Sequence, residues 1–292
     1  MILPFELPLV GQDLVAPIWD GKRFILGRAQ TPVLEYSENF VGWSDDLTSL
    51  HEEVAGDSHP IDCASRYDAI LQIKKAISVE SPVIMEIGCS SGFLLQEIVS
   101  SFPGAITIGA DVVKAPLYRL AEKIPGIPLI RFDLLQCTLP DQIIDVLVMI
   151  NVLEHIEDDV SALKNAFNLL KPGGSLVIEV PAAPYLYDSY DKELCHFRRY
   201  SAAGLQEKML RAGFEIYRKS HIGFMLFPAF AVSKILNKIT WDRSNRDVVR
   251  SKIKSTSENY LVKKAVKFES KYLSDCHLPF GIRVVMTVRK PI

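Results

Sequence analysis

Short apolar runs lie along the middle of the chain, and segments with helical spacing of apolar residues separate them. The runs predict buried strands at 83–87, 106–110, 129–132, 145–150 and 175–180. Alternation of such strands with helices is typical of an α/β protein with a parallel sheet. Residues 214–219 predict a sixth strand, and the alternating segment 282–289 predicts a seventh strand that runs antiparallel.

These elements divide the chain into four parts. An N-terminal extension of residues 1–62, rich in Pro, aromatic and acidic residues, is expected to act as a lid. The core follows in residues 63–221, a helical insertion in 222–281, and the last strand of the core in 282–292. Helices are expected at 44–54, 63–79 and 202–212.

The insertion opens with residues 222–232, which carry no charge. Eleven residues are too few to span a bilayer. Three interpretations stay open: a helix packed on the core or in a homodimer interface, an apolar cover over a substrate pocket, or a helix resting on a membrane beside Lys234 and Lys238.

The composition is that of a globular enzyme. The 292 residues are 48% hydrophobic and 23% charged, and the net charge of −2 gives no nucleic-acid signature. Five cysteines without a C-x-x-C pair do not suggest a disulfide framework. Because the N-terminus lacks the basic start and apolar run of a signal peptide, we expect a cytoplasmic protein.

The small net charge hides two opposite blocks. Residues 1–62 carry three basic and eleven acidic side chains, whereas residues 208–272 carry fifteen basic and five acidic ones. We favour mutual neutralisation of the two blocks. The alternative is that the basic block meets an anionic substrate or an anionic membrane surface.

A turn with two glycines follows the first strand, in the pattern Glu86-x-Gly88-x-Ser90-x-Gly92. Glycine lets backbone approach a ligand closely, and a helix N-terminus favours electron-rich groups. The dinucleotide pattern G-x-G-x-x-G fails, because Ser90 and Phe93 occupy its second and third glycine positions. The turn therefore predicts a nucleotide-type site of another kind at the carboxyl edge of the sheet.

Further chemistry follows the next strands. Asp111 ends the second strand, where a carboxylate can accept hydrogen bonds from both hydroxyls of a ribose, and Asp133 follows the third. The fourth strand runs into Asn151-Val152-Leu153-Glu154-His155. Pro172-Gly173-Gly174 predicts a tight turn between a helix and the fifth strand.

These segments, in this order across residues 83–181, resemble the class I S-adenosylmethionine (SAM)-dependent methyltransferases, of a small-molecule subgroup with VLEH and GH-x-RRY segments. Ser90 stands where that family more often has glycine. The resemblance implies a Rossmann-like fold with a seven-stranded, mostly parallel sheet of order 3-2-1-4-5-7-6 and helices on both faces. It implies SAM as cofactor and S-adenosylhomocysteine as product.

The resemblance also implies where the cofactor binds. Asp133 would hold the adenine amino group, and Asn151 and Glu86 the methionine part. The implied cofactor-binding residues are Glu86, Gly88, Cys89, Ser90, Gly92, Asp111, Val112, Asp133, Leu134 and Asn151.

Candidate residues for the acceptor follow the fourth and fifth strands. His155 is either a general base or a residue that orders its loop. Residues 191–200 resemble the GH-x-RRY segment, with Cys195 in place of glycine, and either bind the acceptor or pin the loop. The expected acceptor-binding residues are Tyr187, His196, Arg199 and Tyr200, with Arg198, Tyr185 and Tyr190 as further candidates. No metal site is expected, since the adjacent Cys195 and His196 make a poor ligand pair.

The expected activity is methyl transfer to a small molecule, with a hydroxyl acceptor favoured over nitrogen or carbon. The [ND]-P-P-[YF] segment of many enzymes that methylate DNA bases is absent after the fourth strand, which argues against nucleic acid. The acceptor is then a metabolite, a sugar or a lipid-linked compound. Two alternatives stay open: a SAM-binding protein without turnover, and an aminopropyl transferase that uses decarboxylated SAM.

Overall fold

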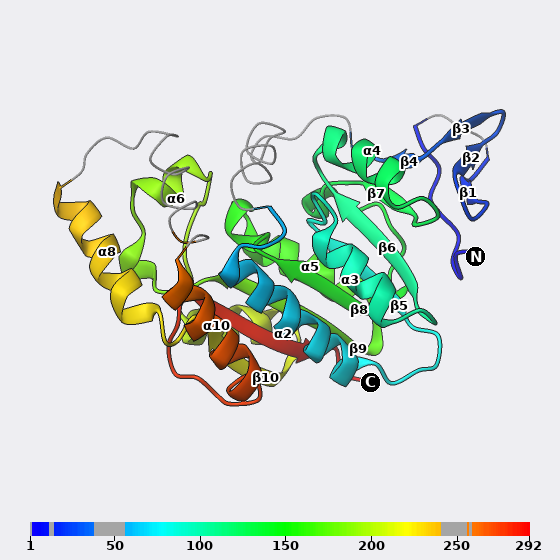
Figure 1. Ribbon diagram of the computed structural model, residues 1–292. Coiled ribbons are helices and arrows are strands. Elements are labelled where there is room, and N and C mark those ends of the chain that lie inside the picture. The colour runs from blue at the N-terminus through cyan, green and yellow to red at the C-terminus, as the bar shows by residue number, and fades with distance from the viewer. Residues whose placement is uncertain (1, 12–14, 38–55, 241–255, 257–258) are drawn as a thin grey trace.

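A single large sheet positions the candidate site (Figure 1). The computed structural model describes residues 2–11, 15–37, 56–240, 256 and 259–292. The strands of the sheet lie in the order β10-β11-β9-β8-β5-β6-β7-β4. They are β4 (Val33–Glu35), β5 (Val83–Ile87), β6 (Ile106–Asp111), β7 (Leu129–Arg131), β8 (Ile144–Ile150), β9 (Leu170–Pro181), β10 (Glu215–Ile222) and β11 (Arg283–Arg289). Neighbours pair in parallel from β4 to β9, and β11 pairs antiparallel with both β9 and β10.

The sheet has eight strands, so the expectation of seven was wrong. The additional strand is β4, which pairs in parallel with β7 at the edge of the sheet. Its three residues come from the N-terminal extension, and the pattern Val33-Leu34-Glu35 is too short to stand out as a strand. The other seven strands run β7-β6-β5-β8-β9-β11-β10.

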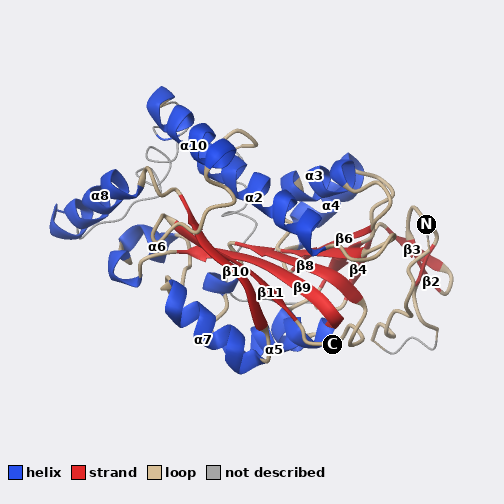
Figure 2. Ribbon diagram, turned by 90° about the horizontal axis from the view of Figure 1, so that it is seen from below, coloured by secondary structure: helices blue, strands red, loops and turns tan. Residues whose placement is uncertain are grey.

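Helices cover both faces of the sheet (Figure 2). One layer holds α2 (Pro60–Ala76), α3 (Phe93–Ser101), α4 (Lys114–Lys123) and α10 (Tyr260–Tyr272), and the other holds α5 (Asp159–Leu169) and α7 (Ala202–Ala212). The remaining described elements of this part are the short α6 (Ser189–Glu193), α8 (Phe227–Thr240) and the 3-10 turns η1 (Leu134–Gln136), η2 (Leu153–His155) and η3 (Pro184–Leu186). Because α2 begins at Pro60, the core starts slightly before residue 63.

The Pro-Gly-Gly segment departs from its prediction. Strand β9 begins at Leu170, directly after α5, and the expected turn lies inside the strand as a bulge between the Ile144–Leu170 and Val146–Ser175 pairs. Gly173 has a positive φ of 77° and donates its N–H to the Lys290 carbonyl. The glycines thus produce an irregular strand, not a separate loop.

The N-terminal segment covers a face of the sheet that the core leaves open. Between β7 and β8 the chain forms only η1, so no full helix covers this part of the sheet. Trp19 and Phe24, from a small sheet of β1 (Ile18–Trp19), β2 (Phe24–Leu26) and β3 (Ala29–Thr31), belong to the same buried cluster as Met85 and Ile130. Described residues of the N-terminal segment therefore contribute to the main hydrophobic core, and the lid role expected for residues 1–62 stays a prediction. The expected helix at 44–54 lies outside the described residues.

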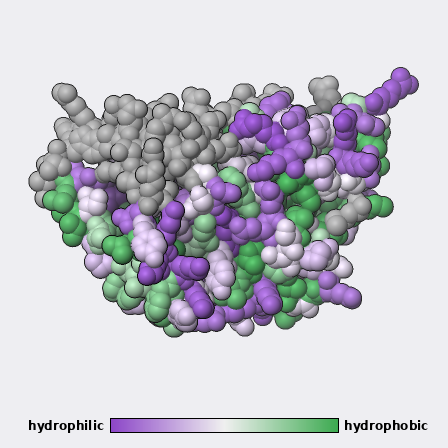
Figure 3. All heavy atoms as spheres, in the orientation of Figure 1, coloured by the Kyte–Doolittle hydropathy of each residue, from purple (hydrophilic) through white to green (hydrophobic). Residues whose placement is uncertain are grey.

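The segment between β10 and β11 contains α8 and α10. Val262 and Val266 of α10 pack with Ile61 of α2, so α10 lies against the first helix of the core. The outer side of α8 leaves Val232 and Leu236 exposed, and hydrophobic residues are visible at the left edge of Figure 3, where α8 lies. Of the described helices, none is both long and apolar enough to cross a membrane.

We expect Phe24→Ala to lower the free energy of unfolding by about 3–5 kcal/mol, because removal of a buried aromatic ring leaves a cavity. Phe24 is 0% exposed, whereas Ile18 on the paired strand is 58% exposed. Ile18→Ala, the matched control, is expected to change stability by less than about 1 kcal/mol. Urea denaturation measures both; equal losses would contradict a structural role for this segment.

Candidate functional site

A cavity of about 600 Å³ opens at the carboxyl ends of the central strands. The turns after β5, β6 and β8 line one part of it, and α2, α8, α10 and the loop after α6 line the other. All ten residues expected to bind the cofactor line this cavity, as do His155, His196 and Arg199. The parallel direction of β5, β6 and β8 brings these distant segments to one edge.

The glycine turn has the backbone geometry that its sequence predicts. Gly88 and Gly92 adopt φ of 79° and 75°, a region that residues with a side chain rarely enter. A Cβ on Gly88 would collide with Val152, and one on Gly92 with Leu120. Ser90 also has a positive φ, of 44°, which fits a position where glycine is more usual. The turn therefore needs glycine for both conformation and space.

Asp111 fastens the glycine turn to the end of β6. Its Oδ2 accepts a hydrogen bond of 2.8 Å from the Ser90 N–H, and its Oδ1 accepts one of 3.0 Å from the Val113 N–H. A carboxylate has about four acceptor positions. Asp111 therefore organises the turn from a position that lines the cavity.

Glu86 is a buried carboxylate at the bottom of the cofactor part of the cavity. It is 5% exposed, and among the described residues its Oε2 has no hydrogen-bond partner. Burial, with Asp111 close by, raises the pKa of Glu86 well above its ordinary value. A cationic group in the cavity would stabilise the ionised carboxylate.

Asp133 and Asn151 complete the cofactor part. The Asp133 side chain accepts from the Leu135 N–H at 2.9 Å, and its own N–H donates to the Ser37 hydroxyl at 2.9 Å. Asn151 has a positive φ of 53° and donates its N–H to the Glu179 carbonyl. The strained backbone at Asn151 turns the chain sharply at the end of β8, beside Gly88.

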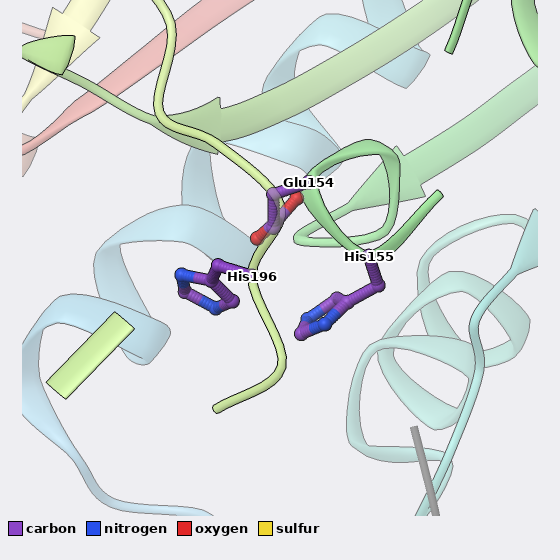
Figure 4. Close-up of side chains that lie close together, drawn as sticks. All are labelled: Glu154, His155 and His196. Atoms are coloured by element: carbon purple, nitrogen blue, oxygen red, sulfur yellow. The ribbon is translucent and has the colours of Figure 1, made fainter. Parts of the chain in front are cut away.

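Three side chains converge at the acceptor end of the cavity, those of Glu154, His155 and His196 (Figure 4). The imidazole rings of His155 and His196 are edge to face, with centroids 4.8 Å apart. Glu154 is 0% exposed, and burial raises its pKa to about 8. Burial and the neighbouring His196 lower the pKa of His155 to about 3, so His155 is neutral near pH 7.

Asp191, in the middle of α6, connects the loop that carries His196 and Arg199 with the insertion. Its Oδ1 lies 3.0 Å from His196 Nδ1 and accepts from Arg199 Nε at 2.8 Å, and its Oδ2 accepts from Lys234 Nζ at 3.0 Å. Lys234 of α8 also donates to Asp188 at 2.6 Å. Despite burial, these three partners hold the pKa of Asp191 far below its ordinary range.

Tyr187 and Tyr200, both expected to contact the acceptor, do not line the cavity. Tyr187 donates its hydroxyl to the His196 carbonyl at 2.7 Å, and buried Tyr200 donates to Asp159 at 2.9 Å. Arg198 pairs with Asp159 as well. These residues hold the loop in place, because their polar atoms bond to other parts of the chain. Tyr185 is also outside the lining, whereas Tyr190 is in it.

Cys195, where the related segment usually has glycine, adopts a positive φ of 55°. The preference for glycine at this position thus has a conformational cause. Arg198 and Tyr200 fasten the loop to Asp159 of the preceding helix α5 and not to the following helix α7. His196 and Arg199 line the cavity, and a substrate contact by these two residues stays a prediction.

Sequence reasoning missed several cavity residues. Lys234 and Arg283 line the cavity, and the partly buried Arg283 pairs with Asp62 and Glu179. Lys234 is the first charged residue after the uncharged run 222–232, and this position in the sequence is the signal that could have found it. The apolar lining includes Ile61, Leu194, Leu226, Phe230, Val262 and Ile282.

The ion pairs of the described residues do not support mutual neutralisation of the two charge blocks. Lys208, Arg218 and Lys234 of the basic block pair with Asp159, Asp68 and Asp188, all in the core. Glu35 of the acidic block pairs with Arg131 and Lys114. Each block is thus neutralised in part by the core that lies between them in sequence.

Comparison with known proteins gives a consistent result. Residues 62–219, more than half of the 292, match a family model described as a methyltransferase domain. A probable S-adenosylmethionine-dependent methyltransferase from Mycolicibacterium smegmatis is 28% identical over 138 residues, which cover 46% of this chain and 52% of that protein. A ubiquinone biosynthesis O-methyltransferase from Vibrio vulnificus is 27% identical, over 44% of this chain and 57% of that protein. The chain thus spans about half the length of these relatives.

A solved structure shows the same fold. Haemonchus contortus phosphoethanolamine N-methyltransferase 2, in complex with phosphomonomethylethanolamine and S-adenosylhomocysteine, aligns with a TM-score of 0.57 at 14% identity. The alignment covers 84% of this chain and 57% of that one.

We expect Asp191→Asn to lower the free energy of unfolding by about 3 kcal/mol, because Arg199 and Lys234 would remain buried without their shared counter-charge. Asp275→Asn serves as the control, since its ion pair with Lys75 is exposed and contributes less than about 1 kcal/mol. Thermal and urea denaturation measure both variants. A loss for Asp191→Asn no larger than that for the control would show that the cluster does not hold α8 in place.

Proposed function

The chain belongs to the family of SAM-dependent methyltransferases, and we propose that it transfers a methyl group from SAM to a hydroxyl of a small, partly apolar acceptor. One observation carries the proposal. The residues expected to hold the cofactor and a pair of histidines line a single cavity, with apolar side chains beyond them. The O-methyltransferase among the relatives supports oxygen as the methylated atom.

The residues present fit the cofactor. The glycine turn after β5 and the Asp111 carboxylate both line the cavity, where Asp111 is placed to accept from ribose hydroxyls. Among the described residues, Glu86 has a carboxylate oxygen without a hydrogen-bond partner. That oxygen suits the ammonium of the methionine part. Asp133 and Leu134 would contact the adenine ring. When bound, SAM supplies a methyl group that a positively charged sulfur already activates.

The task of the protein is then to align the acceptor, exclude water and remove a proton. Alignment alone supplies much of the acceleration in such transfers. Burial lowers the pKa of both histidines, but the Asp191 carboxylate 3.0 Å from His196 Nδ1 opposes this shift in His196 by stabilising the imidazolium. His196 is therefore the better proton acceptor of the two. His155, whose pKa of about 3 makes it a weak base, orients the acceptor beside it.

The insertion covers the acceptor in this proposal. The cavity is lined by Leu226, which precedes α8, by Phe230 of α8 and by Val262 of α10. Lys234 fixes α8 to the loop that carries His196. An acceptor with an apolar portion would bury that portion against these side chains. This arrangement favours the interpretation of the insertion as an acceptor cover.

The experiment that tests the proposed function is a screen of metabolite extracts with isotopically methyl-labelled SAM and mass spectrometry of the products. We expect labelled small molecules with the wild-type chain. The cofactor-deficient control is Asp111→Ala, which should weaken binding of S-adenosylhomocysteine by about 1–3 kcal/mol. Cofactor binding without any labelled product would favour a binding protein, and preference for decarboxylated SAM would favour aminopropyl transfer.

Binding of S-adenosylhomocysteine is expected to release a proton from Glu86. Its raised pKa keeps Glu86 protonated in the free protein, and the ligand ammonium favours the carboxylate. Affinity should therefore increase as the pH rises toward the raised pKa and level off above it. Calorimetry in two buffers of different ionisation enthalpy detects the proton, and Glu86→Gln should remove the buffer dependence. A wild-type heat that is the same in both buffers would contradict this assignment.

His196→Gln is expected to lower kcat by about 10²–10⁴-fold, the usual contribution of a general base. Its affinity for S-adenosylhomocysteine should stay within about twofold, because His196 lies on the acceptor side. His155→Gln should mainly raise the KM for the acceptor. Steady-state kinetics with calorimetry separate these effects, and an unchanged kcat in His196→Gln would exclude the base role.

A further inference from the structure

The geometry points to a divalent metal site formed by Glu154, His155 and His196 at the acceptor end of the cavity. Each residue offers a ligand atom, and these atoms all lie within 4.8 Å of one another. Figure 4 shows the carboxylate and the two rings converging from η2 and from the loop after α6. The sequence did not suggest this set, because His196 is far along the chain from Glu154.

Glu154 is the first reason for a cation at this place. The side chain is fully buried, and among the described residues neither carboxylate oxygen has a hydrogen-bond partner. A buried carboxylate without a counter-charge or hydrogen bond is strongly unfavourable. Arg199 and the partly buried Arg283, whose charges act on Glu154, are already paired with Asp191 and with Asp62 and Glu179. A metal ion would supply the missing charge.

The support behind His196 is the second reason. Histidines that bind metals usually direct their other ring nitrogen to a carboxylate, which fixes the ring and its tautomer. Asp191 lies 3.0 Å from His196 Nδ1, so Nε2 is the nitrogen left for a ligand. Asp191 is itself fixed by Arg199 and Lys234. The ring is therefore held as a metal ligand would be.

The backbone also holds the set together. The Phe197 N–H donates to the Glu154 carbonyl at 2.8 Å, which ties the His196 loop directly to η2. Ligand atoms around an ion at about 2.1 Å are about 3–3.5 Å apart. Contraction of the set by about 1 Å, through rotation of the two imidazole rings, would complete the coordination.

Two imidazoles and one carboxylate suit borderline ions such as Zn²⁺, Mn²⁺, Fe²⁺ or Co²⁺ better than Mg²⁺, which prefers oxygen ligands. Three protein ligands leave coordination positions open toward the cavity. An oxygen of the acceptor could occupy one of them. That last role rests on the proposed methyl transfer, whereas the metal site itself does not. With an ion bound, His196 acts as a ligand and not as a base.

Metal binding is tested on the full chain after dialysis against a chelator. Isothermal titration with Zn²⁺, and the visible spectrum with Co²⁺, should show one ion per chain with the absorption of nitrogen-ligated cobalt. Glu154→Gln and His196→Gln should each weaken Zn²⁺ binding at least tenfold. His277→Ala, which removes an exposed histidine outside the cavity, should leave it unchanged.

Titration of the same preparations with S-adenosylhomocysteine separates this result from the proposed function. Variants that bind S-adenosylhomocysteine like the wild type are folded, so loss of Zn²⁺ binding in them supports the site. No saturable Zn²⁺ binding by the wild type, or equal binding by Glu154→Gln and His196→Gln, overturns it. In a methyl-transfer assay, loss of activity on chelation with recovery on adding Zn²⁺ or Mn²⁺ supports the metal's role toward the acceptor. Full activity in the chelator rejects that role and leaves His196 as the base.

Discussion

The site depends on the parallel direction of β5, β6 and β8, whose carboxyl ends meet at one edge of the sheet. Three turns far apart in sequence thereby face one cavity. Asp111 joins two of these turns, since it accepts from both Ser90 and Val113. The cofactor half is thus made mostly of backbone, fixed by one buried carboxylate, on rigid strands.

The acceptor half is organised differently. Asp191 bonds to His196 and Arg199 of the loop after α6 and to Lys234 of α8, and so couples this loop to the insertion. The cofactor half depends on glycine residues and on closely packed backbone. The acceptor half depends on buried groups of opposite charge that pair with one another. A change in the insertion can therefore alter the position of His196 without touching the cofactor.

Much of the fold was predictable because strands buried on both faces give continuous apolar runs in the sequence. The turn after β5 was predictable because backbone with a positive φ favours glycine, as at Gly88 and Gly92. Less could be predicted where the signal lies in pairing between distant segments. Strand β4 is too short to show a pattern, and the roles of Tyr200 and Lys234 depend on partners elsewhere in the chain.

The small N-terminal sheet has a consequence for dissecting the molecule. The family match begins at residue 62, yet Trp19 and Phe24 fill a face of the main sheet that no core helix covers. A fragment that begins at residue 62 would keep every cavity-lining residue after the glycine turn. It would also expose a broad apolar surface, which includes Ile130. Such a fragment is expected to self-associate, so the segment that the family model matches is shorter than the unit that folds on its own.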